Sequence, residues 1–95
     1  MNYIQTTKDL LEVELKMEGT NYEDLLDVYA LLVFVRGEKC TNKNVHDAWS
    51  IWQDNSMPNH KSLIPFEKLT KEVQDLDSEY RDAIIKVSKM LNIKE

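Results

Sequence analysis

Two histidine-bearing segments, residues 44–49 and 60–69, carry the side chains that are best suited to binding chemistry. If the first segment is helical, His46 and Gln53 project beside Trp49, because residues three or four apart share a helix face. An indole flanked by imidazole and amide groups is a surface on which a nucleobase stacks, and stacking on an aromatic side chain contributes about 1–3 kcal/mol. The sequence therefore predicts a small cleft with an aromatic wall where the two segments converge.

Groups that would hold the phosphate of such a ligand lie in the same region. Asn42 and Lys43 stand at the expected helix start, where backbone N–H groups and the helix dipole favour an anion. Lys61 follows His60 in the second segment, and we expect this pair and Lys43 to contact the phosphate. The predicted ligand-binding residues are Asn42, Lys43, His46, Trp49, Gln53, His60 and Lys61.

Periodicity alone gives a plainer interpretation of the same helix. Val45, Trp49 and Trp52 fall at i, i+4 and i+7, which is the spacing of a buried face. Trp49 would then pack under a central helix, and His46 would form only local hydrogen bonds. Of the two indoles, Trp52 is the one that we expect to be purely a core residue.

The sequence offers no support for catalysis or for a metal site. Gly19 and Gly37 stand alone, so a glycine-rich phosphate loop is excluded, and no serine sits in a nucleophile elbow. His46-Asp47 lacks the second His, four residues on, that a zinc-binding helix needs. Cys40 is the single cysteine, which excludes an internal disulfide and a Cys-type zinc site. We therefore expect a protein that is not an enzyme and has no metal or cofactor.

The composition is that of one globular domain, residues 1–95, with 42% apolar and 31% charged residues. A net charge of −5 disfavours duplex nucleic acid as a partner, because that binding depends on many Lys and Arg contacts to phosphate. The first residues lack the basic leader and apolar run of a signal peptide. The longest apolar run, Val28–Val35, is far shorter than the about 20 residues that cross a membrane. We expect a cytoplasmic protein without a membrane partner.

Helical spacing and capping residues predict the first two helices. Thr6 or Thr7 would cap the first helix, and Gly19 would end it. Asn21 would cap the second helix, which runs to the Arg36-Gly37 stop. This second helix is apolar on nearly all sides, so it should be the buried central helix.

A third helix would begin at a Thr41 or Asn42 cap and end before a loop at residues 54–59, where turn-forming residues cluster. A short extended connection is expected around residues 61–66, because the residue before Pro65 is pushed out of the helical region.

Residues 69–73 should form a short capped turn, and Asp77 or Ser78 should cap the last helix. The predicted fold class is therefore all-α, a small bundle of about four helices.

The order of residues 44–47, Trp49, His60 and residues 63–69 resembles the ryanodine-receptor repeat domain, with Glu79-Tyr80 following at about the expected distance. The resemblance covers about residues 40–92, more than half of the chain.

This resemblance implies a compact, non-catalytic helical domain, and some members of that family hold adenine nucleotides. Trp49 would be the stacking wall, His46 and Asp47 would orient it or contact the ligand, and the His60 segment would form the opposite lip. Two departures stand out: a longer insertion in the family shrinks here to residues 51–59, and Lys61 replaces a proline that usually follows this histidine.

Two functions follow as hypotheses. The first is binding of a nucleotide or nucleotide-derived signalling molecule by a small sequestering protein, which would suit a phage protein that counters nucleotide-signalling defence in the host cytoplasm. The alternative is a protein-interaction or oligomerisation module, because the apolar surface of the first two helices exceeds what a small core covers. Both are compatible in a homo-oligomer that encloses the ligand between protomers.

Overall fold

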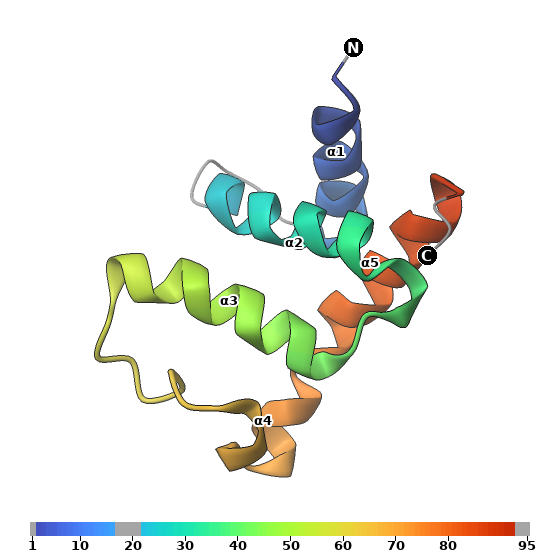
Figure 1. Ribbon diagram of the computed structural model, residues 1–95. Coiled ribbons are helices and arrows are strands. Elements are labelled where there is room, and N and C mark those ends of the chain that lie inside the picture. The colour runs from blue at the N-terminus through green and yellow to red at the C-terminus, as the bar shows by residue number, and fades with distance from the viewer. Residues whose placement is uncertain (1, 17–21, 93–95) are drawn as a thin grey trace.

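The computed structural model describes residues 2–16 and 22–92 and confirms the predicted all-α fold (Figure 1). The described residues form four long helices, α1 (Tyr3–Leu15), α2 (Glu23–Val35), α3 (Asn42–Ser56) and α5 (Ser78–Met90). Shorter helices join them: η2 (Gly37–Lys39), η3 (Phe66–Lys68) and α4 (Lys71–Asp75). None of the described helices is both long and apolar enough to cross a membrane.

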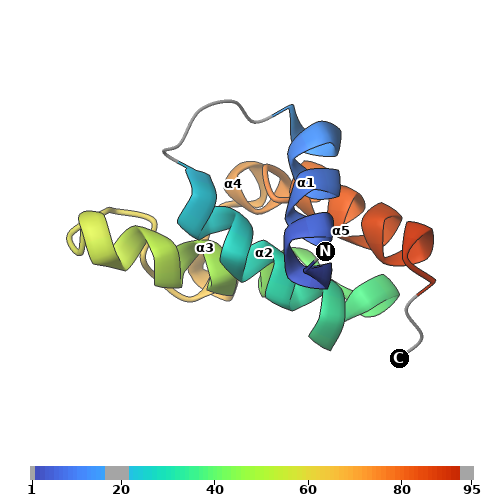
Figure 2. The same ribbon diagram turned by 90° about the horizontal axis from the view of Figure 1, so that it is seen from above.

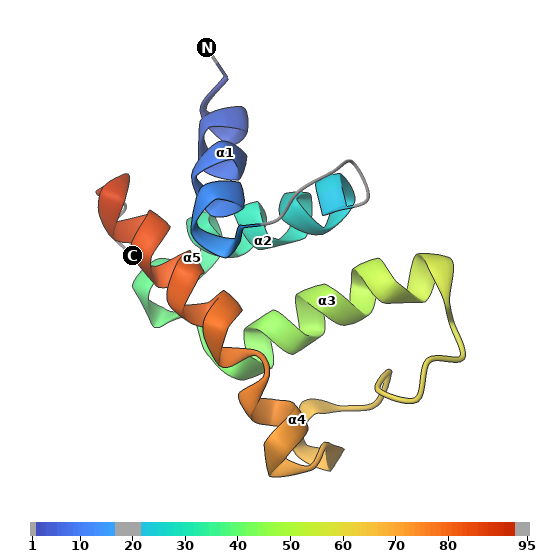
Figure 3. The same cartoon turned by 180° about the vertical axis from the view of Figure 1, so that it is seen from behind.

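α2 is the central helix, as its apolar sequence predicts, but it is not buried on all sides, because Leu31 and Val35 are exposed. α1 crosses it on one side, and α3 runs beside it in the opposite direction (Figures 1 and 2). Seen from behind, α5 passes from α4 towards α1 (Figure 3). The core lies where α1, α2 and α5 meet, and its fully buried side chains include Leu11, Tyr29, Val33, Ile84 and Val87.

The start of α1 differs from the prediction, which placed a cap at Thr6 or Thr7. The cap is Asn2, whose side-chain oxygen accepts a hydrogen bond from the backbone N–H of Ile4 at 2.8 Å. Thr7 is buried within the helix and donates its hydroxyl to the Tyr3 carbonyl at 2.9 Å. Asn caps as well as Ser or Thr, and the earlier start adds a turn of helix. The predicted Gly19 stop and Asn21 cap lie outside the described residues.

The turn from α2 into α3 agrees with the predicted Arg36-Gly37 stop. Gly37 has a φ of 54°, in the left-handed region that a residue without a Cβ adopts at no steric cost. Thr41 then caps α3 through a capping box: its hydroxyl accepts from the Asn44 N–H, and the Asn44 side chain accepts from the Thr41 N–H.

α3 is longer than predicted, because residues 54–56 continue the helix and the expected loop begins only at Met57. The Met57 N–H still donates to the Gln53 carbonyl at 2.8 Å. Residues 57–70, which we call the return segment, then run back from the far end of α3 to α4 (Figure 3). Pro65 is extended, with φ −54° and ψ 144°, and η3 begins directly after it. Thr70 caps α4, close to the predicted short turn.

Candidate ligand-binding pocket

A pocket of about 340 Å³ lies between α2, α3, the return segment and the junction of α4 with α5. Its walls are mostly aromatic. Tyr22 is the N-cap residue of α2 and Tyr29 lies within that helix, Trp49 and Trp52 come from α3, and Tyr80 comes from α5. The remaining lining residues are Leu25, His46, His60, Ser62, Val73, Leu76 and Asp77.

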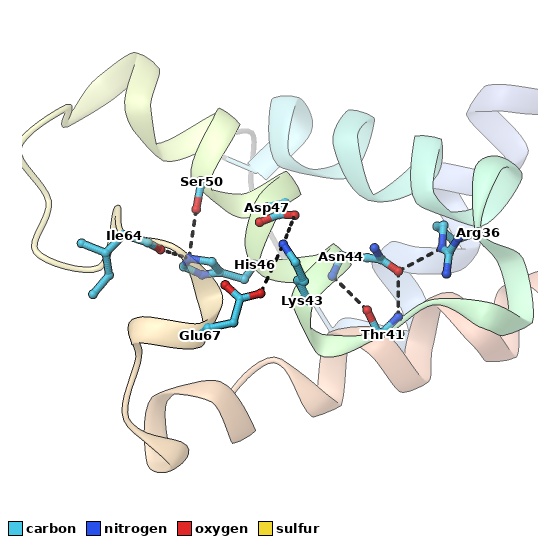
Figure 4. Close-up of polar contacts among 9 residues, drawn as sticks. All are labelled: Arg36, Thr41, Lys43, Asn44, His46, Asp47, Ser50, Ile64 and Glu67. Atoms are coloured by element: carbon cyan, nitrogen blue, oxygen red, sulfur yellow. Dashed lines mark hydrogen bonds and ion pairs between the residues drawn. The ribbon is translucent and has the colours of Figure 1, made fainter.

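His46 fastens α3 to the return segment. It is buried, and its Nε2 lies 2.7 Å from the carbonyl oxygen of Ile64 and 3.4 Å from the hydroxyl of Ser50 (Figure 4). A carbonyl oxygen can only accept a hydrogen bond, so Nε2 carries the proton that it donates. The His46 ring is stacked on Trp49, with 5.8 Å between ring centroids and an angle of 25°.

His60 approaches the same indole from the return segment. Its ring meets Trp49 edge-on, with 5.2 Å between centroids and an angle of 82°. Its Nδ1 accepts a hydrogen bond from the backbone N–H of Ser62 at 3.0 Å, which fixes the direction of the ring. Trp49 is only partly buried, lines the pocket and is in ring contact with both imidazoles.

Asp77 is the only acidic residue among the described residues that line the pocket. It occupies the N-cap position of α5, yet its side chain makes no capping hydrogen bond. Within the described parts of the chain, no hydrogen bond or ion pair involves its carboxylate. Burial raises the pKa of Asp77 above its ordinary value, and the nearby His46 opposes this shift. Burial is also the main cause of the raised pKa of Tyr80.

Lys43, expected to contact phosphate, lies on the outer face of α3. Its ammonium nitrogen is 3.3 Å from a carboxylate oxygen of Asp47 and 3.7 Å from one of Glu67 (Figure 4). These two acidic side chains hold the pKa of Lys43 above its ordinary value, the hydrogen bond to Asp47 contributing most. The charge of Lys43 is therefore already balanced away from the pocket.

Asn42 joins α3 to the following helices. Its side-chain amide donates to the Gln74 carbonyl at 3.1 Å and to the Ser78 hydroxyl at 3.2 Å. Gln53 is partly buried and Lys61 is exposed, and neither lines the pocket. Of the seven predicted residues, the structure thus brings His46, Trp49 and His60 together and places the other four elsewhere.

Several lining residues were not predicted as site residues. Trp52 was expected to be purely a core residue, yet it is partly buried and lines the pocket. Tyr29 and Tyr80 were assigned to helix faces; they lie 5.5 Å apart between ring centroids. One sequence signal pointed to Asp77: it precedes Tyr80 and Ile84 at i, i+3 and i+7, so it continues the buried face of α5.

The described residues contain no group of three or more His, Cys, Asp or Glu side chains arranged to hold a metal ion. Cys40 is buried, and burial raises the pKa of its thiol to about 11. The reactive thiolate is therefore scarce near neutral pH.

The geometry defines a small helical domain with an aromatic pocket on one side of its core. The chain belongs to a family described as a domain of unknown function (DUF7701), whose model matches residues 2–89. Neither a curated protein nor a solved structure matches the chain.

Proposed function

We propose that this protein binds a nucleotide or nucleotide-derived signalling molecule without catalysis, with the base stacked on aromatic side chains in the pocket, and that it acts by sequestering the ligand. The observation that carries the proposal is the position of Trp49, partly buried at the wall of an aromatic pocket and flanked by His46 and His60. We further propose that the domain is related to the ryanodine-receptor repeat and that sequestering the ligand would let a phage counter nucleotide-signalling defence.

The size and charge of the pocket limit what enters it. Ligand pockets span about 300–1,000 Å³, so a volume of about 340 Å³ suits a base with its sugar rather than a whole dinucleotide. No Lys or Arg is present among the described residues that line it. Phosphate groups would therefore remain outside the pocket, where Lys61, next to His60 in the chain, is the predicted contact.

Calorimetry against a panel of nucleosides, linear nucleotides, cyclic nucleotides and ADP-ribose derivatives tests the proposal. We expect at least one base-bearing compound to bind. Trp49→Ala should make its binding free energy less favourable by about 1–3 kcal/mol, the range for base–aromatic stacking. Ile51→Ala is the matched control, because Ile51 is exposed on α3 and does not line the pocket.

Thermal unfolding of both variants separates lost stacking from lost folding. Trp49→Phe, which keeps an aromatic face, should retain part of the affinity. Absence of binding across the panel by the folded wild-type protein would overturn the proposal.

Homo-oligomerisation is the second candidate, supported by apolar surface on α2. Leu31 and Val35 lie one turn apart, and 58% and 52% of their respective surfaces are exposed. Tyr3 of α1 is also exposed and packs edge-on against Phe34. Sedimentation of wild type and Leu31→Glu tests this: an oligomer should become a monomer in the variant, and a monomeric wild type would exclude the candidate.

A further inference from the structure

The carboxylate of Asp77 is the one acidic group among the described residues that line the pocket. It is partly buried in an aromatic wall, and its oxygens accept no hydrogen bond from the described residues. A buried carboxylate is costly to leave unpaired, because it has lost part of its hydration and gained no donor in exchange. A ligand that brings N–H groups to this position would remove that cost.

One ring nitrogen of each imidazole is already engaged within the protein, and Asp77 is the only charged acceptor among the described residues that line the pocket. The Nε2 of His46 is engaged by the Ile64 carbonyl, and the Nδ1 of His60 is engaged by the Ser62 N–H. Tyr29, Tyr80 and Trp49 also line the pocket, and besides ring surface they bring only uncharged hydroxyl and indole N–H groups. The aromatic rings therefore accept the face of a base, and the carboxylate meets its edge.

An ionised carboxylate has two acceptor oxygens and no donor, so it pairs best with two adjacent N–H groups in one plane. Guanine presents such an edge, with N1–H beside the N2 amino group. Adenine and cytosine each place an amino group beside a ring nitrogen that accepts, and this nitrogen repels the second carboxylate oxygen. Uracil has a single N–H between two carbonyls.

We propose that the pocket selects a guanine-type base, with the Asp77 carboxylate accepting hydrogen bonds from N1–H and the N2 amino group. This inference rests on the proposed function, because it assumes that a base enters the pocket. It adds the chemical class of the base and names the residue that selects it.

Titration of the full chain with guanosine, inosine and adenosine tests the inference, using calorimetry or the fluorescence of Trp49 and Trp52. Each hydrogen bond lost to a charged acceptor should weaken binding roughly tenfold. Guanosine should therefore bind most tightly, inosine, which lacks the N2 amino group, about tenfold more weakly, and adenosine more weakly still.

Asp77→Asn should reverse the selectivity rather than merely weaken binding. An amide accepts from N1–H but donates to a carbonyl at position 2, so the variant should prefer xanthosine to guanosine. A gain of xanthosine binding cannot result from misfolding. Glu79→Gln is the matched control, because Glu79 lies exposed in the first turn of the same helix. It should leave the order unchanged.

The outcomes distinguish the two proposals. Nucleosides that bind without preference for guanosine, or a preference that survives Asp77→Asn, would overturn this inference and leave base binding intact. If no nucleoside or nucleotide binds measurably, both the proposed function and this inference are overturned.

Discussion

The two sides of the molecule differ in how they are packed. Where α1, α2 and α5 meet, side chains such as Leu11, Val33 and Ile84 are fully buried. By contrast, none of residues 49–82 is buried, and the structure describes all of them. We call these two parts the core side and the pocket side. The core side supplies most of the buried apolar surface. The pocket side carries the candidate site together with Tyr22, Leu25, Tyr29 and His46, which line it from α2, its N-cap and α3.

Specific polar contacts hold the pocket side together. His46 binds the Ile64 carbonyl, and the Gln74 amide donates to the carbonyls of Phe66 and Leu69 at 2.9 and 3.3 Å. Such contacts fix a geometry but contribute about 1 kcal/mol each to stability. We therefore expect the return segment to open locally at a lower free-energy cost than the core side.

Hydrogen exchange should show the largest difference between the two sides. Amides of α5 near Ile84 and Val87 should exchange only through global unfolding, which costs about 5–15 kcal/mol in domains of this kind. The Leu63 and Leu69 amides, bonded only within turns, should exchange through cheaper local opening. Mass spectrometry of exchanged peptides measures this, and equal protection of both sides would contradict the comparison.

The second-largest difference between the two sides should be the loss in free energy of unfolding when a side chain is truncated. Ile84→Ala removes a fully buried side chain and should lower the free energy of unfolding by about 2–5 kcal/mol. Leu69→Ala removes a partly buried one from the return segment and should cost clearly less. Urea unfolding followed by circular dichroism provides the two values. A larger loss for Leu69 would show that the return segment belongs to the core.

The helix that joins the two sides should be sensitive to its cap. Thr41→Ala removes the oxygen that accepts from the Asn44 N–H at 3.2 Å and should cost about 1 kcal/mol. Fraying of this turn also loosens Asn42, which holds the junction of α4 with α5. Thr41→Ser keeps the oxygen and should stay near wild-type stability. If the serine variant loses as much as the alanine variant, the cap is not the cause.

The fold could be predicted from the sequence more completely than the candidate site could. Helical spacing gave the four long helices, and the Arg36-Gly37 stop and the Thr41 cap depend only on neighbouring residues. Helix ends were less accurate, because Asn2 and Thr6 are both good caps and local sequence does not choose between them. The continuation of α3 through residues 54–56 has the same origin, since turn-forming residues are tolerated in a last helical turn.

The site depends on contacts between residues far apart in the chain. Lys43 and Asn42 have the chemistry of an anion site, but their actual partners, Glu67 and Ser78, come from segments whose positions the sequence does not specify. Tyr29 and Tyr80 meet only because α2 and α5 cross. Sequence reasoning therefore identified side chains with suitable chemistry and could not tell which of them remain available to a ligand.

The smallest expected effect is a pH dependence of stability that originates on the pocket side. Burial raises the pKa of Asp77 above its ordinary value of 3.8, so the folded protein holds this proton more tightly than the unfolded chain does. As pH rises from about 3.8 through the raised pKa, the contribution of Asp77 to stability therefore falls, and it stays unfavourable at higher pH. Asp77→Asn should be slightly more stable than wild type near neutral pH and lose this advantage in acid. Urea unfolding of both proteins between about pH 3 and 7 measures the difference. Parallel profiles would mean that the carboxylate is as hydrated in the folded protein as in the unfolded chain, and Asp77 would then carry no desolvation cost for a ligand to relieve.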